Sequence, residues 1–178
     1  MTRKLFVIVL LLSAANVFAQ APAQQPPPPP PMQERPSAGD YSVIGSPLPD
    51  FTFKANDGKL YSRDDFKNNA NLFIMLFDPG CSHCQQQTKE LEENIEFFKK
   101  SKIVLITNSG FGVRLPDFIK DYNTDKYPFT IGIDSTGIIK QICLYQRFPQ
   151  INIYNKSRKL VKIFVGPVPI DSLKHYIQ

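Results

Sequence analysis

Two cysteines three positions apart, Cys81 and Cys84, are the residues of this 178-residue chain whose spacing most directly indicates chemistry. They enclose Ser82 and His83, follow an apolar run at 72–77, and precede a stretch with the composition of a helix. A sulfur at the start of a helix meets free backbone N–H groups and the positive end of the helix dipole, which favour a thiolate. We therefore predict that Cys81 is a nucleophile and that Cys84, one helical turn later, resolves the mixed disulfide formed at Cys81.

His83 gives this cysteine pair a titratable neighbour. A hydrogen bond from the imidazole to the Cys81 sulfur would stabilise the thiolate, and a stabilised thiolate makes the disulfide a stronger oxidant. We therefore expect a catalytic role for His83 and a reduction potential above the roughly −270 mV of thioredoxin.

Two other interpretations of the cysteine pair are weaker. A structural zinc ion needs four ligands, and besides the pair the chain offers only Cys143, His83 and His175, with no second CxxC motif. A static disulfide across so short a loop gains little from closure. Cys143 lies in the apolar stretch 138–144, so we expect a buried, inert thiol there. We expect no metal and no cofactor.

The first 40 residues do not have the pattern of a folded domain. Arg3 and Lys4 precede an apolar run at 5–12 and a small-residue ending, which predicts a signal peptide at 1–19 that is cleaved after Ala19. The alternative is an uncleaved membrane anchor, and both place the domain outside the cytoplasm, with the bacterial periplasm as the expected location. Residues 20–40 are rich in proline and predict an extended, disordered linker, which leaves 41–178 as the folded domain.

Composition narrows the class of protein. A hydrophobic content of 42% excludes a disordered protein, and the absence of a long apolar run after the leader excludes a multispanning membrane protein. The net charge of +5 falls once the leader is removed. Because the basic residues are scattered among acidic ones, nucleic acid is not expected as a partner.

Strands and helices alternate along the folded part. We expect strands at 51–54, 59–62, 72–77, 103–107, 129–133, 151–154 and 160–165, and helices at 63–66, 84–100, 115–122, 137–144 and 170–177. The run at 72–77 is apolar throughout, as a strand covered on both faces requires. The pattern predicts an α/β fold with a mixed sheet.

Three segments carry a resemblance to a known group: GSPLPDFTF at 45–53, DGK at 57–59 and DPGCSHC at 78–84. They resemble the exported thioredoxin-like proteins of the TlpA/ResA type, which are related to AhpC/TSA. The resemblance implies a thioredoxin-like fold over 41–178, in which helices flank a central mixed β-sheet with an N-terminal β-hairpin and an αβ insertion. It also implies a thiol:disulfide oxidoreductase that acts on protein cysteines, and we expect a monomer. Reduction is the common direction in this group, with electrons from a membrane thiol carrier.

The same resemblance identifies a candidate substrate-binding surface. The family has a cis proline before the C-terminal hairpin, and Pro149 stands in the matching place. The exposed main chain of Phe148 would then pair with an extended substrate peptide beside its disulfide. We therefore take Phe148, Pro149 and Ser82 as candidate substrate-binding residues.

The chain also departs from the family. No Trp precedes the first cysteine, since Phe77 and Gly80 occupy the matching positions, and Met75 replaces the buried Asp of thioredoxin. The proton of Cys84 must therefore pass to water, His83 or another group. Asp78 is a candidate, although an Asp before Pro more often starts a turn.

Two rival functions stay open. A peroxiredoxin-like thiol peroxidase shares the fold, but it needs a Thr three residues before the reactive cysteine, where this chain has Asp78. A redox-inactive module that binds proteins around Phe148 is the other rival.

Overall fold

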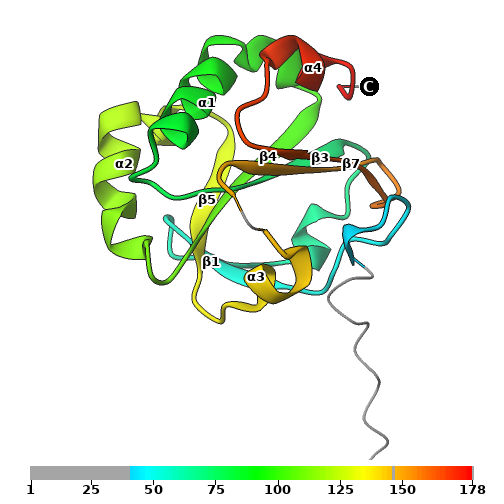
Figure 1. The fold of residues 1–178 in the computed structure, drawn as a ribbon, viewed down its shortest axis with the longest axis horizontal. Helices are drawn as coiled ribbons and strands as arrows, with labels where there is room; N and C mark the ends of the chain where they lie inside the picture. The colour runs from blue at the N-terminus through cyan, green and yellow to red at the C-terminus, as the bar shows by residue number, and fades with distance from the viewer. Residues whose placement is uncertain (1–40, 146, 178) are drawn as a thin grey trace, which may run out of the picture. The chain divides into compact units, whose positions relative to one another are not determined.

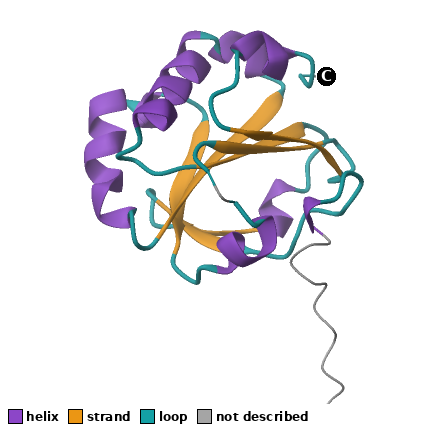
Figure 2. Cartoon of the chain, viewed as in Figure 1, coloured by secondary structure: helices purple, strands orange, loops and turns teal. Residues whose placement is uncertain are grey.

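The computed structural model describes residues 41–145 and 147–177. The predicted signal peptide (1–19) and linker (20–40) lie outside the described residues. The described part forms one seven-stranded sheet with helices on both faces (Figures 1 and 2). Its strands are β1 (Thr52–Ala55), β2 (Leu60–Ser62), β3 (Asn71–Leu76), β4 (Ser101–Asn108), β5 (Phe129–Asp134), β6 (Gln150–Tyr154) and β7 (Leu160–Val165).

The strand order is β2-β1-β5-β4-β3-β6-β7. The three strands β3, β4 and β5 are parallel, while the hairpins β1–β2 and β6–β7 join their outer sides antiparallel. All six residues of β3 are buried, which explains its unbroken apolar sequence. The predicted mixed sheet, its N-terminal hairpin and its C-terminal hairpin are therefore confirmed.

Two hydrophobic clusters cover the two faces of the sheet. Phe73 and Met75 of β3 belong to one cluster, and Leu72 and Ile74 belong to the other, because successive side chains of a strand point to opposite faces. The first cluster includes residues of α1 (Ser82–Glu93), α2 (Leu115–Tyr122) and α4 (Ile170–Lys174), and the second includes residues of α3 (Ile138–Cys143) (Figure 1). The shorter 3-10 turns are η2 (Arg63–Phe66), η3 (Ile95–Phe98), η4 (Gly112–Arg114) and η5 (Thr124–Lys126).

Three predicted helices differ from the structure at their boundaries. The helix expected at 84–100 begins at Ser82 and ends at Glu93, because the Asn94 side-chain amide donates a hydrogen bond to the Glu90 carbonyl at 2.9 Å and the chain continues as η3. The helix expected at 137–144 is confined to α3, since Gly137 and Leu144 both adopt left-handed backbone angles. The last helix, expected at 170–177, ends at Lys174.

Arg158 fixes the turn between β6 and β7 to the segment that leads into β3. Its guanidinium donates to the carbonyl oxygens of Phe66 and Ala70, each at 2.6 Å, and to Oδ1 of Asn68 at 2.6 Å. Its backbone is left-handed, with φ of 56°. The Arg158 side chain therefore links the β6–β7 turn to the segment before β3.

Within 41–145 and 147–177, no helix has the length and apolar character to cross a membrane.

Candidate redox site

Cys81 and Cys84 lie where β3 passes into α1, at the carboxyl end of a central strand. Cys81 is the N-cap of α1, with extended backbone angles, and its carbonyl accepts the first helical hydrogen bond from Gln85 N at 3.0 Å. All three cysteines are free thiols; Cys81 is partly exposed and Cys84 is 0% exposed. The structure thus brings together one reachable sulfur and one buried sulfur a single helical turn along.

The surroundings of Cys84 keep its thiol protonated. Burial raises the pKa of Cys84 far above its usual range, and the neighbouring Cys81 adds to the rise, while hydrogen bonding to the backbone of Asp78 opposes it. Cys84 is therefore no nucleophile at neutral pH until a base takes its proton. Of the pair, only Cys81 is exposed enough to meet a partner.

Asp78 shapes the loop before the cysteines. Its Oδ1 accepts the backbone N–H of Gly80 at 2.8 Å, and its carbonyl accepts the N–H of Cys81 at 3.0 Å. These bonds close a turn, as the Asp-Pro sequence predicts. The same Oδ1 also forms an ion pair with Nη2 of Arg114 at 3.0 Å. Its carboxylate is thus held between the loop backbone and a guanidinium.

Arg114 is the site residue that the sequence analysis missed. It ends η4, in the connection between β4 and α2, and its guanidinium lies against Gly80. A Cβ atom built on Gly80 would come within 2.9 Å of Cζ of Arg114. The guanidinium also lies over the ring of Phe111, with Cζ 5.3 Å from the centroid. Because β3 and β4 are parallel neighbours, the loops after them emerge at one edge, and this topology was the available signal.

Phe148 and Pro149 lie where the resemblance predicted, before β6. The Phe148–Pro149 peptide bond is cis, as expected. Phe148 is partly buried and packs edge-to-face on Phe111, with ring centroids 5.8 Å apart, and against Tyr145 at 5.0 Å. Phe148 and Cys81 pack against the same hydrophobic cluster. Aromatic rings therefore connect the cis proline to Arg114.

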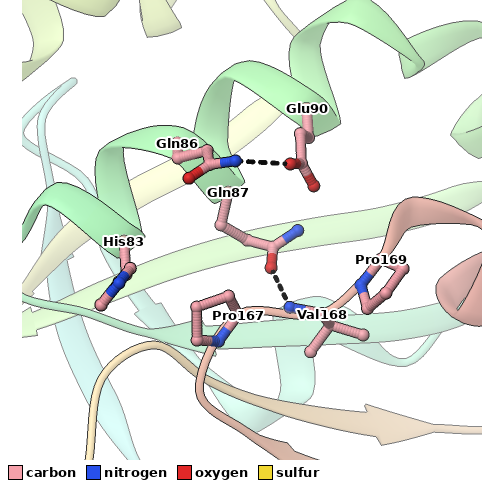
Figure 3. A pocket seen from close by; sticks show the side chains of 7 residues that line it. All are labelled: His83, Gln86, Gln87, Glu90, Pro167, Val168 and Pro169. Atoms are coloured by element: carbon pink, nitrogen blue, oxygen red, sulfur yellow. Dashed lines mark hydrogen bonds between the residues drawn. The ribbon is translucent and has the colours of Figure 1, made fainter.

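His83 and Ser82 are both exposed on the first turn of α1. His83 lines one end of a hollow of about 320 Å³ that runs along the helix toward Pro167 and Pro169 (Figure 3). The Oε1 atom of Gln87, on the same helix, accepts the backbone N–H of Val168 at 2.8 Å and ties α1 to the loop before α4. The expected hydrogen bond from His83 to Cys81 stays a prediction.

Cys143 lies apart from this pair. It is 8% exposed and belongs to the cluster on the opposite face of the sheet from Cys84. Burial raises the pKa of its thiol to about 12. The predicted burial of Cys143 is confirmed. Within the described part of the chain, no group of three or more His, Cys, Asp or Glu residues is placed to hold a metal ion.

Comparisons with known proteins agree with this architecture. The model of the AhpC/TSA family matches residues 44–150, which is more than half of the chain. No curated protein sequence matches the chain.

Similar solved structures include three bacterial proteins. The thioredoxin domain of a thiol-disulfide oxidoreductase from Bacteroides vulgatus is 17% identical, with a TM-score of 0.63 over 76% of this chain and 99% of that one. StoA from Bacillus subtilis is 18% identical, with a TM-score of 0.59 over 76% and 98%. A secreted disulfide oxidoreductase of Mycobacterium tuberculosis is 16% identical, with a TM-score of 0.59 over 71% and 92%. At these identities the likeness establishes the fold, which is thioredoxin-like, as the resemblance implied.

Proposed function

The chain belongs to the AhpC/TSA family, and from this premise we propose that it is a thiol:disulfide oxidoreductase that exchanges disulfides with protein cysteines. One observation carries the proposal: a partly exposed Cys81 caps α1, and a fully buried Cys84 follows it by one turn. A reachable nucleophile backed by a protected second thiol is the arrangement that reversible dithiol chemistry needs.

In the reducing direction the reaction has two steps. The Cys81 thiolate attacks one sulfur of a substrate disulfide, which forms a mixed disulfide and releases the other substrate sulfur as a thiolate that takes a proton. Cys84 then loses its proton and attacks the Cys81 sulfur, which forms the Cys81–Cys84 disulfide and releases the substrate as a dithiol. Two electrons pass from the enzyme to the substrate, and the reverse sequence oxidises a substrate dithiol.

The second step requires a base for Cys84. We take Asp78 as this base, because its backbone contacts the Cys84 thiol and its carboxylate acts on that thiol electrostatically. The ion pair with Arg114 holds this carboxylate in place, and water can carry the proton between the two groups. The proposed role of His83 is to favour the Cys81 thiolate, which would make the reduction potential more oxidising.

The substrate-binding role assigned to Phe148, Pro149 and Ser82 is part of the proposal. An extended peptide that pairs with the main chain at Phe148 would carry its disulfide past Cys81 and the exposed hydroxyl of Ser82. The partly buried Phe148 ring then forms the apolar floor of this path.

Export is proposed from the leader at 1–19, with the linker at 20–40 as a spacer and 41–178 as the working domain. The periplasm is the proposed location, and a membrane thiol carrier the proposed electron donor. The proposed partners are proteins with cysteines or disulfides, and the chain is proposed to act as a monomer.

Insulin reduction by dithiothreitol tests the proposal. The wild-type protein is expected to accelerate precipitation of the insulin B chain, Cys81→Ser to abolish the acceleration, and Cys143→Ser to retain it. Equal acceleration by wild type and Cys81→Ser, or none by wild type, would favour a binding module instead. Rapid consumption of hydrogen peroxide in the presence of dithiothreitol would instead indicate a peroxidase. We do not expect it, because Asp78 stands where that chemistry needs Thr.

A further inference from the structure

A half-exposed guanidinium borders the reachable sulfur. The side chain of Arg114 is 48% exposed, and it lies against Gly80, the residue that precedes Cys81. Asp78 anchors it through Nη2 at 3.0 Å. A guanidinium has five N–H donors in a planar fork, and one carboxylate oxygen occupies only part of them. Nη1 of this guanidinium lies where a side chain at Gly80 would begin, next to the residue that carries the reachable sulfur.

The neighbouring charges do not cancel this cation. Asp78 is only 18% exposed and already shares its Oδ1 between Gly80 N–H and Arg114. Asp134, the last residue of β5, is 2% exposed, and its oxygens accept backbone N–H groups of 136, 137 and 139. Arg147 precedes Phe148 and is exposed, so a second cation flanks the proposed peptide path. Arg114 beside Gly80 and Arg147 beside Phe148 thus place two cations next to residues of the proposed substrate path.

An aromatic side chain contacts the same guanidinium. Val113, next to Arg114 in the chain, is 83% exposed, and Phe111 packs between the guanidinium and the Phe148 ring. Phe111 connects the Arg114 guanidinium to Phe148, which is part of the path proposed for the substrate. A segment that covers these side chains must satisfy a cation as well as bury apolar area.

We infer that Arg114 is a specificity-determining residue that selects substrate proteins with an acidic side chain near their reacting cysteine. The inference rests on the proposed thiol:disulfide exchange. A substrate carboxylate would accept the free donors of the guanidinium, while a substrate Lys or Arg at that place would be repelled. The anchor on Asp78 holds the guanidinium in place before the substrate arrives, which lowers the ordering cost of the contact.

Rates of oxidation of the reduced protein by three disulfides test the inference. Two are peptides that contain the same disulfide and differ only in Glu or Lys beside one cysteine, and the third is the small neutral bis(2-hydroxyethyl) disulfide. For wild type we expect the acidic peptide to react about fivefold faster than the basic one, the upper end for a partly exposed ion pair. The preference is expected to collapse in 1 M salt.

Variants assign the preference to one side chain. The ratio of the two peptide rates is expected to approach one in Arg114→Gln and to invert in Arg114→Glu. Because the ratio is taken within each variant, a change in the reactivity of Cys81 cancels. Lys120→Gln, an exposed cation on α2, is the matched control and is expected to keep the wild-type ratio. If Arg114→Glu does not fold, Arg114→Gln and the salt series still decide.

The outcomes separate the two proposals. A wild-type protein that is not oxidised by bis(2-hydroxyethyl) disulfide overturns the proposed function. A wild-type protein that reacts with this reagent but treats both peptides alike, or an Arg114→Gln variant with the full preference, overturns the role of Arg114 alone.

Discussion

Gly80 and Arg114 share one space beside the dithiol, because the guanidinium lies where any side chain at position 80 would begin. The thioredoxin-like proteins that the sequence resembles usually carry Trp before their first cysteine. Here the wall beside Cys81 comes instead from another loop, and it is charged rather than aromatic.

This shared space predicts the effect of Gly80→Ala. The added methyl must displace the guanidinium, which can move into solvent, so we expect a loss of less than about 1 kcal/mol in the free energy of unfolding, measured in urea. Gly132→Ala is the contrast, because its Cβ would lie 2.7 Å from the Cα of Ala55 in the neighbouring strand, where backbone must shift. There we expect a loss of about 2 kcal/mol or more. Equal losses in the two variants would mean that Arg114 is not free to move.

Alkylation of the reduced protein should separate the three thiols. Under native conditions at pH 8 we expect iodoacetamide to add one label, at Cys81, because Cys84 and Cys143 are buried and burial raises the pKa of both thiols. In urea all three should be labelled. Peptide mass spectrometry gives the positions, and a native label at Cys84 would contradict the assignment of the reachable sulfur.

The buried thiol also predicts the result of trapping. Cys84→Ser cannot resolve a mixed disulfide, so its Cys81 should retain covalently bound partner proteins that are released by dithiothreitol. Cys143→Ser is the control, since it keeps both thiols of the pair and should trap little. Equal trapping by the two variants would remove the resolving role from Cys84.

Stability should depend on pH through Cys84. Burial raises the pKa of Cys84 in the folded state. The stability that the protonated, buried thiol contributes is therefore fully present below the pKa of an unfolded cysteine, about 8.5, and is lost as the pH rises above that value. Between pH 7 and pH 10, we expect the reduced wild-type protein to lose about 2 kcal/mol more than Cys84→Ser. Cys143 and Tyr154, whose pKa values burial also raises, are present in both proteins and cancel. Urea denaturation of both proteins at each pH measures the difference in the free energy of unfolding. The same change with pH in the two proteins would contradict the burial of an ionisable Cys84.

Arg158 predicts a stability effect far from the cysteines. Arg158→Met removes the donors to the carbonyls of Phe66 and Ala70 and to the side chain of Asn68, and we expect a loss of about 2 to 4 kcal/mol. Lys156→Met, in the same turn, should change stability by less than about 0.5 kcal/mol. Insulin reduction by the folded Arg158→Met protein should stay near wild type, since the clamp lies at the end of the sheet away from Cys81.

The sequence predicted those parts of the fold that depend on local pattern. β3 was identified because a strand buried on both faces must be apolar throughout, and α2 has the bounds that were expected for it, 115–122. The helix from Cys84 was extended too far because the bond from Asn94 to Glu90 depends on a side-chain conformation that periodicity does not report. The position of Pro149 came from the resemblance.

The cysteines of the site were predicted, and the cation beside them was not. The pair at 81 and 84 is contained in four residues, so spacing alone reveals it. Arg114 reaches Gly80 only because the parallel pairing of β3 and β4 brings two loops to one edge, and such proximity is a property of the folded sheet rather than of any short segment.

The difference in accessibility between the two sulfurs has a consequence under oxidative stress. An oxidant in the surrounding medium meets Cys81 first and converts it to a sulfenic acid. Cys84, protected below the surface yet adjacent, can condense with that sulfenic acid to a disulfide and release water before further oxygen is added. Such damage would thus end in a state that a reductant can reverse, and irreversible oxidation would require the loss of the inner thiol.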